Sequence, residues 1–166
     1  MIKTISDDFF NKAMAFLEVA IISSKEKENI YFHTAEYSNV TAYLVYHATE
    51  LFLKFAIFQA SKKLVEGHDI FKLYEKYKKC YSDEKLKINI PFTKPEDVCY
   101  GDLPEEQIQK FKAKYKMSFE QQLKYPIDKE NNIYNLITIF DTEWLESYKD
   151  ELFKLYFELK KVNSCI

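Results

Sequence analysis

One segment constrains the fold of this chain more than any other part of it. Residues 43–60 are apolar almost all round when they are placed on a helix, and the helical pattern continues over about residues 37–63. A helix without a polar face has to be covered on every side by other elements. Gly67 interrupts the pattern soon afterwards. We therefore predict a long helix in the middle of a helical bundle.

Three further helices are predicted around this one. The first covers about residues 7–24, where apolar residues recur every three or four positions. Asp69 is a suitable N-cap for another helix, which ends near residue 81. The last helix covers about residues 141–162, and its apolar seam consists of Leu145, Tyr148, Leu152, Leu155, Leu159 and Val162. The predicted fold class is mainly α, a helical bundle that forms one domain over residues 1–166.

The stretch before the last helix, about residues 82–140, is predicted to be a long insertion. Apolar and polar residues alternate over residues 86–92, which indicates an extended chain. Residues 102–105 are typical of a helix start. Residues 122–127 and 133–139 flank a polar turn and are compatible with a short β-hairpin.

The composition argues against several kinds of site. The net charge is −2 and the pI about 6.0, so no global positive field attracts nucleic acid. Only two glycines are present, too few for a glycine-rich phosphate loop. Cys80, Cys99 and Cys165 form no CxxC pair, which argues against a zinc site or a disulfide framework. All 24 basic residues are lysines, so chemistry that needs an arginine guanidinium is excluded.

The sequence also indicates where in the cell the protein is expected. Asp7 and Asp8 precede the first apolar stretch, which is unlike the basic start of a signal peptide. No uncharged run approaches the ~20 apolar residues that span a bilayer. We therefore expect a cytoplasmic protein that makes no membrane contact.

Three ionisable residues stand out inside the apolar helix. His47, Glu50 and Lys54 lie within about 60° of one another on a helical wheel and form one polar line. Glu50 precedes Lys54 by four residues, which is the favourable order for an ion pair. Because an unpaired charge among apolar neighbours is costly, we expect these two side chains to pair. The stripe is either a buried ion pair that fixes the helix or a ligand-binding site.

The sequence around this stripe resembles the HEPN family, the higher-eukaryote and prokaryote nucleotide-binding domains. The matching segments are residues 46–56, Tyr-His-Ala-Thr-Glu-Leu-Phe-Leu-Lys-Phe-Ala, and residues 67–70, Gly-His-Asp-Ile. The resemblance covers about residues 7–81. It implies an up-and-down bundle of four to five helices that is often a homodimer. Family members occur beside nucleotidyltransferases, in toxin–antitoxin pairs and in phage-defence systems, so the resemblance also implies a nucleotidyltransferase-type protein partner.

Catalytic members of this family are metal-independent ribonucleases that carry an Arg, four to six residues and then a His late in the domain. This chain has no Arg, and its last histidine is His68. The resemblance therefore implies a degenerate, non-catalytic module that binds a nucleotide, RNA or a protein partner. The candidate binding residues are His47, Glu50, Lys54, His68 and Asp69, and His68 is the one catalytic candidate.

Two alternatives stay open at this point. The first is a metal-independent ribonuclease toxin or defence effector in which a lysine has taken over the basic role. The second is a structural dimer subunit that binds no ligand. We expect neither a metal nor a cofactor in any of the three cases.

Two further patterns concern the surface. Lysines between residues 72 and 87 alternate with tyrosines, an arrangement that suits phosphate contact and base stacking as well as an ordinary solvated helix face. The last helix also carries aromatic residues outside its seam, namely Trp144, Phe153, Tyr156 and Phe157. These rings predict a homodimer interface, unless the insertion folds back and covers them.

Overall fold

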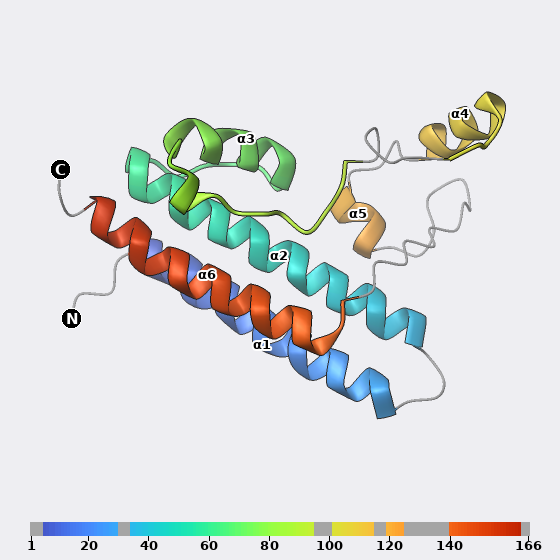
Figure 1. Ribbon diagram of the computed structural model, residues 1–166, viewed down its shortest axis with the longest axis horizontal. Helices are drawn as coiled ribbons and strands as arrows, with labels where there is room; N and C mark the ends of the chain where they lie inside the picture. The colour runs from blue at the N-terminus through green and yellow to red at the C-terminus, as the bar shows by residue number, and fades with distance from the viewer. Residues whose placement is uncertain (1–4, 30–33, 95–100, 115–118, 125–139, 164–166) are drawn as a thin grey trace.

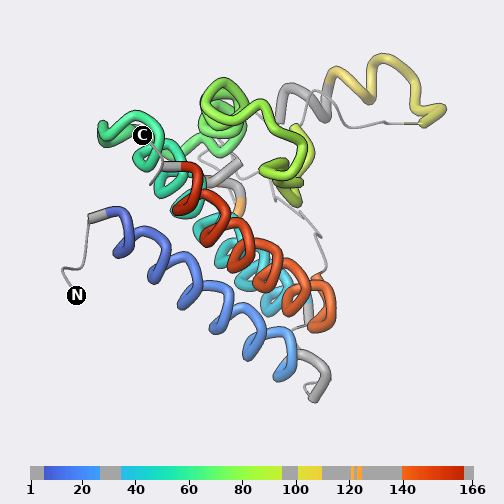
Figure 2. Tube along the Cα trace, turned by 60° about the vertical axis from the view of Figure 1, so that its left-hand side comes forward, coloured from blue at the N-terminus to red at the C-terminus, as the bar shows by residue number. Residues whose placement is uncertain are grey.

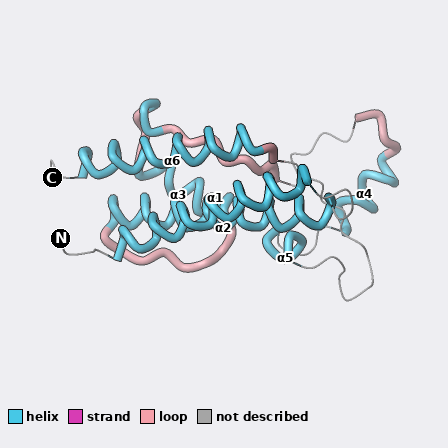
Figure 3. Tube along the Cα trace, turned by 90° about the horizontal axis from the view of Figure 1, so that it is seen from below, coloured by secondary structure: helices cyan, strands magenta, loops and turns pink. Residues whose placement is uncertain are grey.

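The computed structural model describes residues 5–29, 34–94, 101–114, 119–124 and 140–163 of the chain. Its elements are α1 (Ile5–Asn29), α2 (Thr34–Ser61), α3 (Ile70–Cys80), the 3₁₀ helix η1 (Glu84–Leu86), α4 (Glu105–Lys114), α5 (Phe119–Lys124) and α6 (Thr142–Asn163). Figure 3 shows helices joined by loops, and no strand occurs within these ranges. The predicted mainly α fold is confirmed.

Three long helices form the body of the molecule (Figure 1, Figure 2). α1 and α2 run antiparallel as a helical hairpin, and α6 packs against both of them, antiparallel to α1. α3 packs against α2. The central position predicted for α2 is confirmed, because Val45, Phe52 and Phe55 are completely shielded from solvent.

The predicted seam of α6 is correct over most of its length. Its residues from Leu145 to Leu159 are buried, and the Tyr148 hydroxyl shares a 3.0 Å hydrogen bond with that of Thr49 in α2. The prediction is wrong for Val162, which is 45% exposed. Val162 lies in the last turn of α6, beyond the point where the described elements cover the helix.

The segment that follows α3 adds to the core although it forms no strand. Leu86, Ile88 and Phe92 are buried, whereas Lys87 and Asn89 between them are exposed, as the alternation in the sequence predicts. The hydroxyls of two tyrosines in α3 donate hydrogen bonds to carbonyls of this segment, Tyr74 to Ile88 and Tyr77 to Leu86. These hydrogen bonds fasten the segment to α3.

Two short helices, α4 and α5, occur in the described part of the rest of the insertion. α4 begins close to the predicted start and stands apart from the body of the molecule (Figure 1, Figure 3). The predicted hairpin is wrong over residues 122–124, which belong to α5, and its remaining residues lie outside the described ranges. Glutamine, leucine and lysine favour helix, and Leu123 is buried in a helix that packs on α2. In the described part of the chain, no helix combines the length and apolarity that a bilayer span needs.

Candidate functional site

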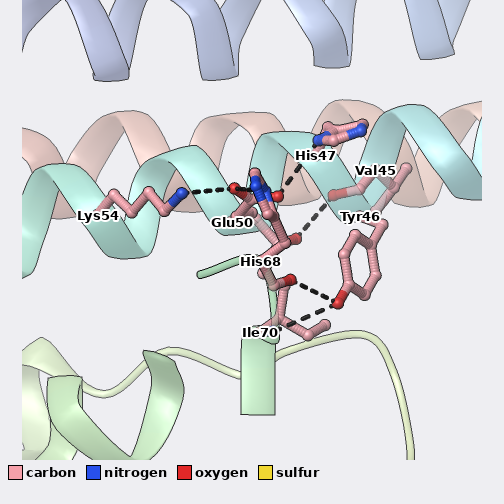
Figure 4. A network of polar contacts seen from close by, with 8 residues as sticks. Val45, Tyr46, His47, Glu50, Lys54, His68 and Ile70 are labelled. Carbon is pink, nitrogen blue, oxygen red and sulfur yellow. Dashed lines mark hydrogen bonds and ion pairs between the residues drawn. The ribbon is translucent and has the colours of Figure 1, made fainter. Parts of the chain in front are cut away.

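The candidate site lies where the end of the α2–α3 connection returns to the middle of α2. The helical period places His47, Glu50 and Lys54 on one side of α2. Gly67 has φ +93°, a backbone conformation that residues with a Cβ rarely adopt. The turn at Gly67 precedes His68, whose side chain points back towards Glu50 (Figure 4).

Tyr46 holds the start of α3 against α2. Its hydroxyl donates a hydrogen bond to the His68 carbonyl at 2.8 Å and accepts one from the Ile70 N–H at 3.3 Å (Figure 4). Asp69 is the N-cap of α3, as predicted, because its side chain accepts hydrogen bonds from the N–H groups of Phe71 and Lys72. These hydrogen bonds hold the backbone from the His68 carbonyl to the first turn of α3.

Glu50 is the centre of the polar network. Its side chain is only 3% exposed, and its Oε1 accepts hydrogen bonds from Lys54 Nζ at 2.8 Å and from His68 Nδ1 at 3.0 Å. His47 Nδ1 lies 3.3 Å from Oε2. The predicted pairing of Glu50 with Lys54 is confirmed, and both histidines are within reach of the same carboxylate. The network does not include Asp69, whose carboxylate caps α3 and pairs with Lys72 at 3.3 Å.

The electrostatics keep Glu50 ionised. Burial acts to raise the pKa of the Glu50 carboxyl, but the contacts with His47 and Lys54 and the positive charges nearby outweigh it and lower the pKa. The two oxygens of the carboxylate differ in their hydrogen bonds. Oε2 is buried and accepts no well-directed hydrogen bond from any described residue.

The two histidines have different surroundings. His47 is 18% exposed and packs between aromatic rings, with Phe16 stacked at 5.6 Å and Tyr43 edge-on at 4.5 Å between ring centroids. His68 has 63% of its side chain exposed. His47 and Lys54 are thus interior members of the network, and among its members His68 is the one that reaches solvent.

This arrangement gives His68 a defined orientation. A carboxylate that binds one ring nitrogen of a histidine selects the tautomer and leaves the other nitrogen available. With Nδ1–H donated to Glu50, the Nε2 atom of His68 is an acceptor in the neutral ring and donates a hydrogen bond to an anion when the ring is protonated. Within the described residues, no group of three or more His, Cys, Asp and Glu side chains is placed to hold a metal ion.

The lysine-rich stretch next to the site divides into two faces. Lys72, Lys76 and Lys79 are exposed on the outer face of α3. Two of the three tyrosines of this stretch cannot stack on a base, because Tyr77 is 1% exposed and Tyr81 is 9% exposed. The interpretation as base-stacking residues is therefore wrong for these two. Tyr77 shares the inward face of α3 with Ile70 and Leu73, and Tyr81 is the buried C-cap of the helix.

Sequence reasoning missed the role of Tyr46. On a helix that is apolar all round, a tyrosine is expected to fill space, and nothing in the local pattern shows that its hydroxyl meets the start of the next helix. The buried pair of Thr49 and Tyr148 was missed for the same reason, since it joins residues of two distant segments.

Comparisons of the chain with protein-family models, with curated proteins and with solved structures find no match. The HEPN resemblance therefore rests on the two short segments that carry it.

The buried ion pair leads to a first prediction. Lys54→Met leaves the Glu50 carboxylate without its closest counter-charge, and breaking one partner of a buried pair typically costs about 3–5 kcal/mol. We expect urea unfolding to show a loss of that order. The double variant Glu50→Gln/Lys54→Met removes both charges and should recover part of it. Single variants as stable as the wild type would contradict a structural role for the pair.

The lowered pKa of Glu50 leads to a second prediction. Because the folded-state pKa lies below the value of 4.5 taken for the unfolded chain, the ionised carboxylate stabilises the fold fully above that pH. This contribution is lost as the pH falls towards the folded-state pKa. We expect the free energy of unfolding to fall more steeply between about pH 5 and pH 3 in the wild type than in Glu50→Gln. Parallel pH profiles for the two proteins would show that Glu50 has an ordinary pKa.

Proposed function

We propose that this chain is a HEPN-like binding module that recognises the phosphate groups of RNA or a nucleotide beside His68, without cleaving the ligand. The observation that carries the proposal is the contact between the buried Glu50 carboxylate and Nδ1 of the exposed His68. A structural ion pair alone needs only Glu50 and Lys54. The added histidine extends the network from the core to the surface.

Charges on the neighbouring helix support a phosphate ligand. The outer face of α3 presents Lys72, Lys76 and Lys79, and these residues are one turn apart in succession. Lys72 shares its charge with Asp69, whereas Lys76 and Lys79 are in no ion pair with another described residue. Because the net charge of the chain is −2, binding would depend on this local face.

Ribonuclease activity is the second candidate function, and one observation favours it. A carboxylate bound to Nδ1 is the arrangement that orients a histidine as a general base through Nε2. Cleavage also requires a group that protonates the leaving oxygen. Of the residues beside His68, Asp69 is occupied in capping α3, and Lys72 pairs with it. We therefore rank binding above cleavage.

The RNA-binding proposal gives a third prediction. We expect the full chain to bind a fluorescent single-stranded RNA in fluorescence anisotropy, with an affinity that falls as salt rises. Lys72→Gln/Lys76→Gln should reduce the slope of log K against log salt by about 0.7 for each phosphate that the variant no longer neutralises. His68→Ala should weaken binding severalfold, whereas the control Lys12→Gln, at an exposed position of α1, should leave it unchanged.

Experiments with the same protein and RNA distinguish binding from cleavage and from a function without RNA. RNA incubated with the protein and a metal chelator should remain intact. Cleavage that disappears in His68→Ala would replace the binding proposal with the ribonuclease. Absence of RNA binding even at low salt would contradict both functions and favour a protein partner, such as the nucleotidyltransferase-type protein that the resemblance implies, or the structural subunit.

Association gives a fourth prediction. We propose a homodimer in which α6 takes part, because Phe153 and Phe157 are 47% and 49% exposed. Among the described residues of the insertion, Phe140 stacks on Trp144 at 4.6 Å, and none is in ring contact with Phe153 or Phe157. Light scattering should give twice the chain mass of 19.9 kDa. Phe153→Lys/Phe157→Lys should give the monomer, whereas Leu64→Lys, at a site that is 61% exposed, should not. A monomeric wild type would contradict the dimer.

A further inference from the structure

A second surface, independent of the His68 region, is a hollow between α6 and the segment of η1. Its volume is about 370 Å³, within the range of small-molecule sites. Leu155 lies in the hollow and is 6% exposed. Lys85 and Lys87 line it from the η1 side, and Asp150 and Glu151 line it from α6.

The η1 side of the hollow carries two lysines, whereas the α6 side carries more carboxylates than cations, namely Asp150, Glu151 and Glu158 beside Lys154. Among the described residues, no ion pair joins the lysines of the η1 side to the carboxylates of α6, and Asp150 and Lys85 are in no ion pair at all. Lys87 pairs with Glu84 on its own side, at a distance of 3.7 Å. Charged groups of opposite sign thus face a common space without meeting.

Glu151 is the most unusual of these groups. It is half-buried, and its carboxylate accepts a hydrogen bond from the backbone N–H of Asn89. Burial raises the pKa of the Glu151 carboxyl, and this hydrogen bond offsets the rise only in part. A cation placed beside Glu151 would remove the remaining cost of ionisation. Lys154, one turn away on α6, also lines the hollow but forms no ion pair with Glu151.

From this arrangement we infer that the hollow binds a small zwitterion, of the size of a dipeptide, with an ammonium group and a carboxylate at opposite ends. The ammonium group lies against Asp150 and Glu151, and the carboxylate lies against Lys85 and Lys87. Such a ligand satisfies both sides at once, which an ion of one sign does not. Electrostatic complementarity of this kind selects a partner by its charge pattern more than by its area.

A set of four dipeptides tests the inference on the full chain. Ala-Ala carries both charges, N-acetyl-Ala-Ala only the carboxylate, Ala-Ala amide only the ammonium group, and N-acetyl-Ala-Ala amide neither. NMR titration of the ¹⁵N-labelled protein should show saturable shifts of the Asn89 and Glu151 amides with Ala-Ala. Each peptide with one charge should bind about tenfold more weakly, as expected for the loss of one charge-assisted hydrogen bond.

Variants assign each end of the ligand. Lys85→Gln/Lys87→Gln should lower the affinity for Ala-Ala to that for Ala-Ala amide and leave the binding of Ala-Ala amide unchanged. Glu151→Gln keeps a hydrogen-bond acceptor but removes the charge. It should lower the affinity for Ala-Ala to that for N-acetyl-Ala-Ala and leave the binding of N-acetyl-Ala-Ala unchanged. The matched double variant Lys12→Gln/Lys63→Gln changes two exposed lysines outside the hollow and should leave the affinity for Ala-Ala unchanged. No saturable shift with Ala-Ala, equal binding of all four peptides, or equal binding of Ala-Ala and N-acetyl-Ala-Ala would overturn the inference.

Discussion

A carboxylate in the middle of the most buried helix is the constraint on which the arrangement of α2 and α3 depends. Glu50 is 2% exposed, and a carboxylate at that depth is tolerated only when cations and donors surround it. Lys54 supplies a charge from the same helix and binds Oε1 at 2.8 Å. His68 comes from the α2–α3 connection and shares Oε1 with Lys54. This connection is therefore held by the polar network as well as by the apolar contacts of α3.

Much of the fold follows from local patterns in the sequence. The periodicity of apolar residues identifies α1, α2, α3 and α6, and the spacing of Glu50 and Lys54 predicts their pairing. Gly67 marks the turn that brings His68 back, although the sequence shows neither the direction of the turn nor the contact that it makes. Contacts between distant segments, such as that of Tyr46 with the start of α3, leave no periodic signal, and sequence reasoning could not find them.

The errors have a common origin in packing between segments. The sequence from residue 122 onwards is compatible with a strand. In the structure, however, residues 122–124 are helical, and Leu123 is buried in a helix that packs on α2. Tyr77 and Tyr81 alternate with lysines in the sequence, yet the helical period turns them to the core and turns the lysines to solvent. Val162 fits the spacing of the seam, but the described elements do not extend far enough to cover it. In each case the burial or conformation of the residue depends on the element packed against it, and the local sequence pattern does not identify that element.

The absence of arginine limits the side chains that can neutralise this carboxylate. A guanidinium group can bind both oxygens of a carboxylate with two parallel hydrogen bonds, whereas an ammonium group acts as a single point of charge. In a chain without arginine, several side chains can together take the place of one guanidinium group at a buried carboxylate. Here Lys54 and His68 converge on Oε1, while Oε2 has only the 3.3 Å approach of His47. The two oxygens therefore differ in their hydrogen bonds, and His68 links the buried charge to the surface.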